Sequence, residues 1–393
     1  MTAPDSIGIG WRPSSVSGWG VYGTNLILEL LALERNPVLA APPHRLDVDP
    51  DIAAKLAPVF QRQEHLSDLL EKTGVLEFDF PVLHALRNDF QPALADQPLQ
   101  GSHNIGVIFF EDTDISEEGL ARARDYDMIV TGSTWNKEVL QRRGLDHVVN
   151  VFQGIDDSLF VRAPRPDTYE DRFVIFSGGK LEYRKAQDVV IAAFREFREN
   201  HPEALLMFAW ANQWPVIMPT IANSPFVEGH PEVLANNELA IAPWLIANGL
   251  PEDSFIDLGM PANKDMPRYL AAADAAIFPN RCEPGTNLVA MEAMAASVPC
   301  LIAANTGQHD LIDEGNCYPL NKQTPVAPYE PYAGVDGWRE PDVFEVVESL
   351  ESLYADPEEA RRRGDSGADF IRQFSWKNQI EALVGHIDDL YRS

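Results

Sequence analysis

The chain has few cysteines, few cations and no long apolar run. Its 393 residues include three cysteines, Cys282, Cys300 and Cys317. Their odd number and their spacing exclude a disulfide framework or a cysteine zinc site, and we expect them to be reduced and buried. No stretch of about 18 apolar residues is present, so no membrane-spanning helix is expected. The first residues lack the basic and apolar regions of a secretory signal, which favours a cytoplasmic protein.

Positive charge is scarce. There are 31 Lys and Arg against 60 Asp and Glu, a formal net charge of −29. This balance argues against nucleic acid or an anionic membrane as a partner, because most of the surface would repel either one. A site for a phosphorylated ligand must then be a local exception. With 45% hydrophobic and 23% charged residues the composition is that of a globular protein, and the length predicts about two domains.

Short apolar runs alternate with helical patterns along the chain, and this alternation predicts α/β domains with parallel sheets. Residues 160–171 carry two prolines and several charges without periodicity, and we interpret them as a linker. The prediction is therefore a first domain over residues 1–165 and a second over residues 172–374. The predicted strands are 7–10, 105–110, 128–131 and 148–152, then 173–177, 204–210, 255–258, 275–278 and 299–303.

The last segment has the pattern of an amphipathic helix. Ser375 is a suitable N-cap, and Trp376, Ile380, Leu383 and Ile387 recur at helical spacing behind it. A helix with such an apolar face needs a surface to cover. We expect Trp376 to be a core residue without a ligand role.

Residues 281–292 combine a predicted strand end, a turn containing Pro and Gly, and the start of an alanine-rich helix. Thr286 is expected to cap this helix, which begins near Leu288. Free backbone N–H groups at a helix start favour an anion, so this segment predicts a site for a phosphorylated ligand.

Two cations about a hundred residues upstream support the same prediction. Lys180 and Lys185 follow the predicted strand 173–177, at the end of a parallel sheet where α/β proteins bind ligands. A diphosphate needs positive charge on flexible stems, which lysine provides. The alternative is that both are solvated surface lysines.

These two segments resemble the retaining, nucleotide-sugar-dependent glycosyltransferases of family 4, and the resemblance spans most of the chain. Residues 179–186 are similar to the Gly-Arg-Leu…Lys-Gly segment of that family, with Lys180 in place of arginine and Ala186 in place of glycine. Glu283 and Glu292 are similar to its paired glutamates, with one additional residue between them in the Gly-Thr-Asn turn. The resemblance implies the GT-B fold: two Rossmann-like, doubly wound parallel-sheet domains that face each other across a cleft. It also implies that helix 375–393 returns to the first domain.

The resemblance further implies roles for individual residues. Glu292 would accept hydrogen bonds from the ribose hydroxyls of the donor, and Lys180 and Lys185 would hold the diphosphate. Glu283 would touch the sugar or phosphates. The other donor contacts predicted are Gly285, Thr286, Asn287 and Leu288 in the turn, Met260 beside the base, Gly18 and Gly20 in the loop across the cleft, and His309 after the strand 299–303.

Glu111 directly follows the predicted strand 105–110. Many family members have a histidine near this point that contacts the transferred sugar, and here Glu111 or Asp112 takes its place. We interpret Glu111 as a group that positions the sugar or acts as a weak base. His309 could equally be an ordinary residue at a helix start.

The resemblance implies transfer of a hexosyl group from a nucleoside-diphosphate sugar to an acceptor hydroxyl with retention of configuration. Within the family, a UDP-sugar is the expected donor. The leaving diphosphate would take the acceptor proton, and neither a metal nor another cofactor would be required. Loops 14–25, 42–50 and 111–118 are predicted to hold the acceptor, whose identity they do not reveal, and the oligomeric state is left open.

Three alternatives remain at this stage. The Asp-x-Asp patterns at 112–114 and 47–49 could bind a metal, as in the GT-A transferases. Glu111, Asp112 and His309 could be the acid and base groups of a nucleotide-sugar 2-epimerase with the same two-domain architecture. The chain could also be a nucleotide-sugar-binding module without catalysis.

Overall fold

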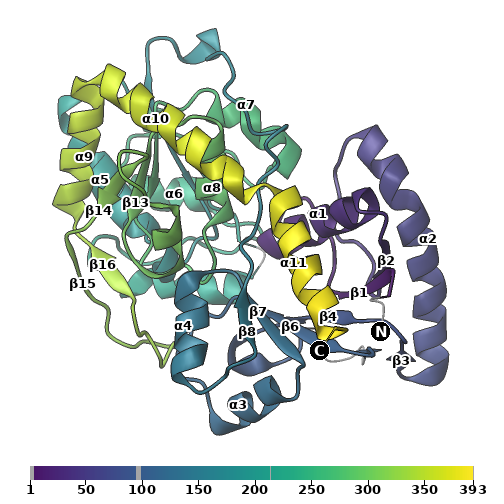
Figure 1. Ribbon diagram of the computed structural model, residues 1–393. Coiled ribbons are helices and arrows are strands. Elements are labelled where there is room, and N and C mark those ends of the chain that lie inside the picture. Colours follow the sequence, from purple (N-terminus) through teal and green to yellow (C-terminus); the bar gives the residue numbers. More distant parts are fainter. Residues whose placement is uncertain (1–3, 94–98, 213, 393) are drawn as a thin grey trace.

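The computed structural model describes residues 4–93, 99–212 and 214–392 (Figure 1). It contains two α/β domains, each built on a six-stranded sheet whose paired strands are all parallel. The prediction of two doubly wound parallel-sheet domains is therefore confirmed. None of the helices in these residues is sufficiently long and apolar to cross a membrane.

The first sheet has the strand order β2-β1-β4-β6-β7-β8. The chain adds β2 on one side of β1 and later adds β4 on the other side. The boundary between β1 and β4 is therefore a topological switch point. The sequence analysis missed β2 and β4. The strands are β1 Ser6–Gly10, β2 Asn36–Leu39, β4 Val82–Leu86, β6 Asn104–Ile108, β7 Met128–Thr131 and β8 Val148–Asn150.

The second sheet has the order β11-β10-β9-β12-β13-β14, with its switch point between β9 and β12. All of the strands predicted here are present, and β14 is additional. The strands are β9 Phe173–Gly178, β10 Ala204–Ala209, β11 Phe255–Asp257, β12 Ala275–Phe278, β13 Cys300–Ala303 and β14 Tyr318–Leu320. Two short two-stranded pairs complete the list: β3 Leu76–Glu77 with β5 Leu99–Gln100, and β15 Gln323–Pro325 with β16 Arg339–Pro341.

Helices cover the sheets and bury their apolar faces against them. The first domain carries α1 Gly18–Ala32, α2 Pro50–Thr73, α3 Glu117–Arg124 and α4 Thr134–Arg142. The second carries α5 Gln187–Asn200, α6 Ile241–Ala247, α7 Met266–Leu270, α8 Leu288–Ala295, α9 Val343–Ala355 and α10 Pro357–Ile371. The last helix, α11 Trp376–Leu390, leaves the second domain and packs against α1 (Figure 1).

The chain passes from the first domain to the second and later returns. Val151 packs in the core of the first domain, whereas Ile155 and Phe160 already pack in that of the second. The chain therefore crosses at residues 151–155, earlier than the predicted linker 160–171, which lies against the second domain. On the return, the N–H of Trp376 donates to Ile155 O at 3.0 Å, so both crossings lie side by side.

Besides the two chain crossings, a segment between β15 and β16 joins the domains through non-covalent contacts. Residues 326–338 leave the second domain and meet the loop after β6, near α4 (Figure 1). The N–H of Gly334 donates to Asp112 Oδ1 at 2.7 Å, and Trp338 Nε1 donates to Glu111 O at 3.2 Å. We call residues 326–338 the strap.

We predict that Trp376→Ala destabilises the protein strongly. The indole is 4% exposed, and it stacks on Tyr22 of α1 with ring centroids 5.5 Å apart. Removing a buried tryptophan leaves a cavity and costs about 3–5 kcal/mol, measurable by denaturant unfolding. The matched control is Lys377→Ala on the exposed face of α11, for which the change stays within about 0.5 kcal/mol. Equal effects in the two variants would contradict the packing of α11 described here.

Candidate active site

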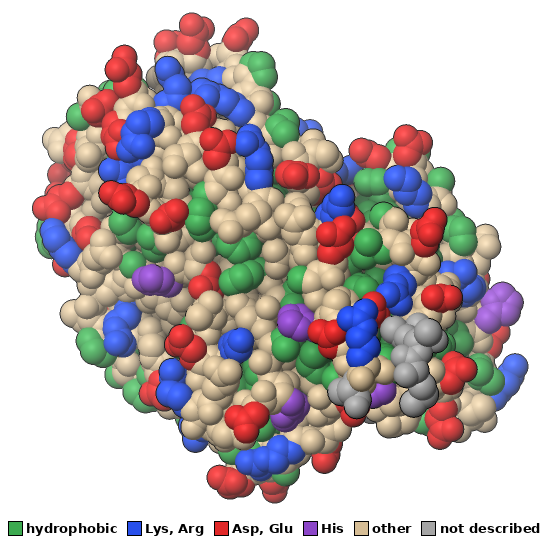
Figure 2. Space-filling model, in the orientation of Figure 1, with side chains coloured by type: hydrophobic (Ala, Val, Ile, Leu, Met, Phe, Trp, Pro, Cys, Tyr) green, Lys and Arg blue, Asp and Glu red, His purple; other side chains and the backbone are tan. Residues whose placement is uncertain are grey.

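Two adjoining cavities lie between the domains, at the carboxyl ends of both sheets. The large cavity has a volume of about 1740 Å³ and the small cavity about 310 Å³. The outline of the molecule is notched between the two domains (Figure 2). Loops after β9 and β12 form one wall of the small cavity, and the loop before α1 forms the other. Of the thirteen predicted site residues, ten line it: Gly18, Glu111, Lys180, Lys185, Met260, Glu283, Gly285, Asn287, Leu288 and Glu292.

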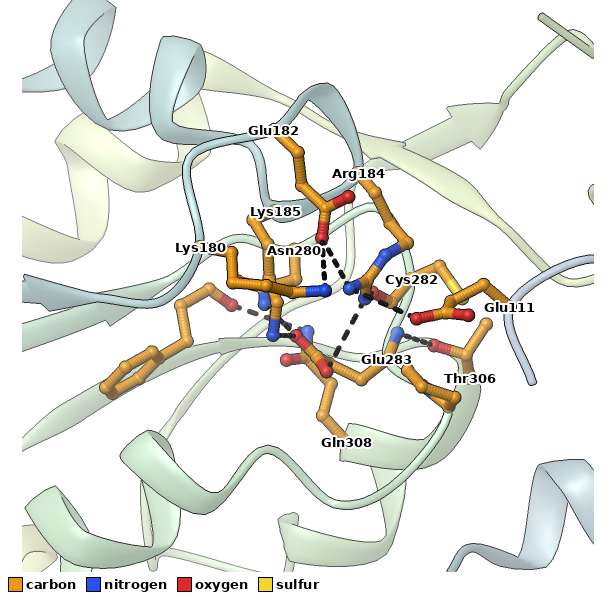
Figure 3. A network of polar contacts seen from close by, with 12 residues as sticks. Glu111, Lys180, Glu182, Arg184, Lys185, Asn280, Cys282, Glu283, Thr306 and Gln308 are labelled. Carbon is orange, nitrogen blue, oxygen red and sulfur yellow. Dashed lines mark hydrogen bonds and ion pairs between the residues drawn. The ribbon is translucent and has the colours of Figure 1, made fainter. Parts of the chain in front are cut away.

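A compact network of ionic groups forms the floor of this site (Figure 3). Three cations follow β9, and three carboxylates lie among them, one of which comes from the first domain. Lys185 Nζ contacts Glu283 Oε1 directly, and Lys180 Nζ lies 3.7 Å from Glu182 Oε1. The six groups are Lys180, Arg184 and Lys185 with Glu111, Glu182 and Glu283, so their formal charges cancel when all are ionised.

Arg184 is the centre of this network, and the sequence analysis missed it. Its side chain is only 2% exposed, and a guanidinium nitrogen lies 2.6 Å from Glu182 Oε1. The same nitrogen, Nη2, lies 3.5 Å from Glu111 Oε1, and Nη1 lies 3.6 Å from Glu283 Oε2. Burial disfavours its charge, but the three carboxylates outweigh that effect and raise the pKa of Arg184. The signal in the sequence was its place between Glu182 and Lys185, directly after a buried strand.

The two predicted lysines differ in their surroundings. Burial lowers the pKa of Lys185, and the neighbouring Glu283 carboxylate opposes this effect in part. Its side chain is 12% exposed, whereas that of Lys180 is 33% exposed. The Lys180 ammonium lies 5.2 Å from the ring centroid of Trp214. Both lysines therefore line the small cavity, with Lys185 largely buried and Lys180 more exposed to solvent.

Ala186 ends the turn that carries these cations. It adopts the left-handed conformation with φ 59°, where an L side chain is strained and glycine is favoured. The family resemblance places glycine at this position. The alanine is fully buried, so the packing of α5 holds the turn in this shape.

Glu292 lies in α8 at the opposite side of the small cavity. It is 6% exposed, and Asn263 Nδ2 donates a hydrogen bond to its Oε1 at 2.5 Å. Burial raises the pKa of Glu292 to about 8, although the bond from Asn263 lowers it in part. A ligand hydroxyl that bonds to this carboxylate would restore the hydrogen bonds that burial removes.

The turn before α8 offers hydrogen-bond donors to the cavity. Asn287 takes a left-handed conformation with φ 70°, and α8 has no side-chain cap. Nδ2 of Asn287 is buried and lacks a hydrogen-bond partner among the described residues. The predicted cap Thr286 does not act as one, because its hydroxyl bonds to Met291 Sδ at 2.9 Å. It is buried behind the turn and does not line the cavity.

Two further predictions about single residues are not supported by their positions. His309 is exposed and lines neither cavity. Gly20 packs beneath the loop, where a Cβ atom would lie 2.2 Å from Ser14 Cβ. Glycine is needed there for this close approach, and Gly20 does not reach the small cavity.

The acidic pairs considered as metal sites have other partners. Asp112 accepts N–H groups from Asp114 and from the strap, and Asp47 and Asp49 lie 2.6 and 3.8 Å from Lys264 Nζ. Residues 4–93, 99–212 and 214–392 contain no group of three or more His, Cys, Asp or Glu that could hold a metal ion. With Asp112 in the strap contact and His309 outside the site, Glu111 is the single member of the proposed epimerase set in the cavities.

We predict that Glu292 makes stability depend on pH. The folded protein keeps the proton up to about pH 8, whereas the unfolded chain releases it near the ordinary value of 4.5. The native state therefore binds more protons between these values, and stability falls as pH rises through this interval. Unfolding measured from pH 5 to 8 should show a shallower fall in Glu292→Gln than in the parent. Glu358→Gln, at an exposed position of α10, is the control and should keep the parental slope.

Arg184→Gln should destabilise the fold, because it leaves two buried carboxylates and the half-buried Glu111 without their shared partner. Breaking a buried ionic network costs about 3–5 kcal/mol. The control Arg162→Gln breaks an exposed pair with Asp365, which is worth at most about 1 kcal/mol. Unfolding in guanidinium chloride compares them, and an equally small loss in both would contradict the central place of Arg184.

Within the second domain, one segment matches a known protein family. Residues 172–331 match the family model described as glycosyl transferases group 1. This range includes both lysines of the site and both glutamates of α8 and its preceding turn. No curated protein sequence matched the chain.

Solved structures match along almost the whole length. Sucrose-phosphate synthase from Thermosynechococcus elongatus has a TM-score of 0.65 at 16% identity, covering 98% of this chain and 99% of that one. HepE from Anabaena, in complex with UDP and glucose, has a TM-score of 0.63 at 12% identity with the same coverage. Trehalose-6-phosphate synthase has a TM-score of 0.65 at 11% identity, covering 97% and 98%. The chain therefore has the GT-B fold, and its second domain carries the sequence features of the group 1 glycosyltransferases.

Proposed function

We propose that this protein is a metal-independent, retaining glycosyltransferase that moves a hexosyl group from a UDP-sugar to an acceptor hydroxyl. The observation that carries the proposal is the composition of the small cavity. Two lysines, an unpartnered amide and a buried carboxylate, all from the second domain, converge on a space at the β9/β12 switch point. These are Lys180, Lys185, Asn287 and Glu292.

Each part of the proposed donor is assigned to its own group of residues in this cavity. The diphosphate is assigned to Lys180, Lys185 and the uncapped N–H groups at the start of α8, which together supply charge and directed hydrogen bonds. The ribose is assigned to Glu292. UDP is chosen because HepE, a structural relative of the whole chain, was solved with UDP-glucose.

In the proposed reaction, the acceptor oxygen attacks the anomeric carbon from the face that the diphosphate leaves. The bond from this carbon to the diphosphate oxygen breaks, and that oxygen takes the acceptor proton. The main contribution of the protein is electrostatic: Lys180 and Lys185 stabilise the charge that grows on the departing diphosphate. Glu111, held by Arg184, would position the sugar.

The test is the release of nucleotide from UDP- and GDP-sugars, with and without EDTA. The proposal expects UDP release that EDTA does not reduce, and a product with the anomeric configuration of the donor by NMR. Loss of activity in EDTA would show a metal requirement. Conversion of the sugar without release of UDP would identify an epimerase, and binding of UDP-sugar without any turnover would identify a binding module.

Lys185→Ala should lower kcat by about 10²- to 10³-fold, the usual effect of removing one donor that stabilises a developing oxyanion. Thermal unfolding should change far less, because Glu283 keeps its bonds to Asn280 and Arg184. Lys72→Ala, at an exposed position of α2, is the charge-matched control and should keep the parental kcat. Near-parental turnover in Lys185→Ala would remove Lys185 from the site.

A further inference from the structure

The first-domain wall of the large cavity is basic. The adjacent strands β2, β1 and β4 are parallel, so the loops that follow them emerge at one edge of the sheet. Each loop contributes an arginine to the wall: Arg45 after β2, Arg12 after β1, and Arg87 after β4. Among the described residues of the first domain, Glu111 is the one carboxylate in this cavity's lining, and it already faces Arg184.

Hydrogen bonds join the loops after β1 and β2 into one unit. The N–H of His44 donates to Pro13 O at 2.9 Å, and Ser15 Oγ donates to Arg45 O at 2.9 Å. These bonds run between loops that are thirty residues apart in sequence. They hold the backbones of Arg12 and Arg45 beside each other, so the wall is a built feature of the first domain.

The arginines of this wall are not paired with carboxylates. Among the described residues, Arg12 has no hydrogen bond or ion pair, Arg45 contacts Met260 Sδ, and Arg87 donates to Pro92 O. Acidic residues outnumber basic ones by 60 to 31, and arginines such as Arg35 and Arg281 pair with carboxylates, whereas others, such as Arg172 and Arg195, bond only to backbone carbonyls. The nearby carboxylates Asp47 and Asp49 are bound to Lys264 instead. The three arginines of the wall are exposed and lie together on one side of the large cavity, where an anion that enters the cavity can reach them.

An aromatic surface connects this wall to the small cavity. Trp19 lines both cavities, and its ring centroid lies 5.5 Å from that of Trp11. Its ring also meets that of Phe109 edge to face, with the centroids 4.9 Å apart. An indole face of this kind binds the apolar face of a sugar ring. A ligand resting on Trp19 would therefore have the basic wall at one end and Lys180 and Glu111 at the other.

We propose that the acceptor is an anionic hydroxyl compound whose phosphate or carboxylate is held by Arg12, Arg45 and Arg87. The proposal rests on the glycosyltransferase function proposed above and names its second substrate class. Guanidinium groups bind such oxyanions with two parallel hydrogen bonds, which lysine cannot do. The acceptor hydroxyl then points into the small cavity, bonds to the anomeric carbon and gives its proton to the departing diphosphate oxygen.

The net charge of −29 also bears on which kind of anion the wall would bind. An acidic surface repels anions over most of its area, and a local cationic wall directs them to one place. The same surface disfavours an anionic bilayer. The structure thus favours a small soluble anion over the headgroup of a lipid, although both would offer the same oxyanion chemistry to the arginines.

The experiment uses the full chain and matched pairs of acceptors: glucose 6-phosphate with glucose, 3-phosphoglycerate with glycerate, and glucuronate with glucose. Vesicles containing phosphatidylglycerol form a further arm, compared with vesicles of phosphatidylcholine. Two readouts are taken: release of UDP from UDP-glucose, and binding of each compound to the UDP-loaded protein by calorimetry. We expect at least one more highly charged compound to bind and react better than its partner. Soluble compounds should surpass vesicles.

Arg12→Gln and Arg87→Gln should each raise the KM or dissociation constant for that compound about 10- to 100-fold, the usual effect of losing a charge-assisted hydrogen bond. The dissociation constant for UDP should change less than twofold. Arg361→Gln removes an exposed arginine of α10 and is the charge-matched control. Circular dichroism of each variant establishes that it folds.

The outcomes separate the two proposals. Failure of UDP to bind would overturn the proposed function itself. If UDP binds, the anionic-acceptor proposal is overturned when no charged compound surpasses its partner in binding, or when the arginine variants bind it as the parent does. Preference for anionic vesicles over every soluble anion would overturn the choice of a soluble acceptor.

Discussion

Ionic groups can be buried between two domains if each has a partner, and this requirement governs the centre of the molecule. Arg184 is surrounded by carboxylates from its own turn, from the turn before α8 and from the first domain. It thereby keeps Glu283 in place while Lys185 faces the cavity. Under the proposed function, a diphosphate would compete with Glu283 for this lysine, and its binding would be coupled to rearrangement of the network.

The two domains are joined across the cleft at several points besides this network. Ser133 Oγ donates to Pro284 O at 2.7 Å, and the N–H of Asn263 donates to Ser15 O at 2.8 Å. The strap adds its bonds to Asp112. Together these contacts hold the loops of the first domain over the ends of β9 and β12. The proposed transfer would use this arrangement to align donor and acceptor and to keep water from the donor.

Sequence reasoning predicted the second domain better than the first. Its strands are continuous apolar runs, as buried parallel strands should be, whereas β2 contains Pro37 and β4 contains His84 and escaped notice. Of the site, the lysines and the glutamates of the second domain were predicted from motif and spacing. Arg184 was missed because its role depends on carboxylates that are distant in sequence, and Thr286 was misassigned because its hydroxyl bonds to Met291 instead.

The sequence alone determined the alternation of strands and helices, the parallel sheets, the cationic turn after β9 and the two glutamates flanking the turn before α8. These follow from local periodicity and from short segments whose chemistry is complete within a few residues. Only the tertiary structure decided which charges neutralise each other, which side chains line the cavities and which arginines are left without acidic partners. Those outcomes depend on distances between loops far apart in the chain, and on burial, which changes the cost of every charge.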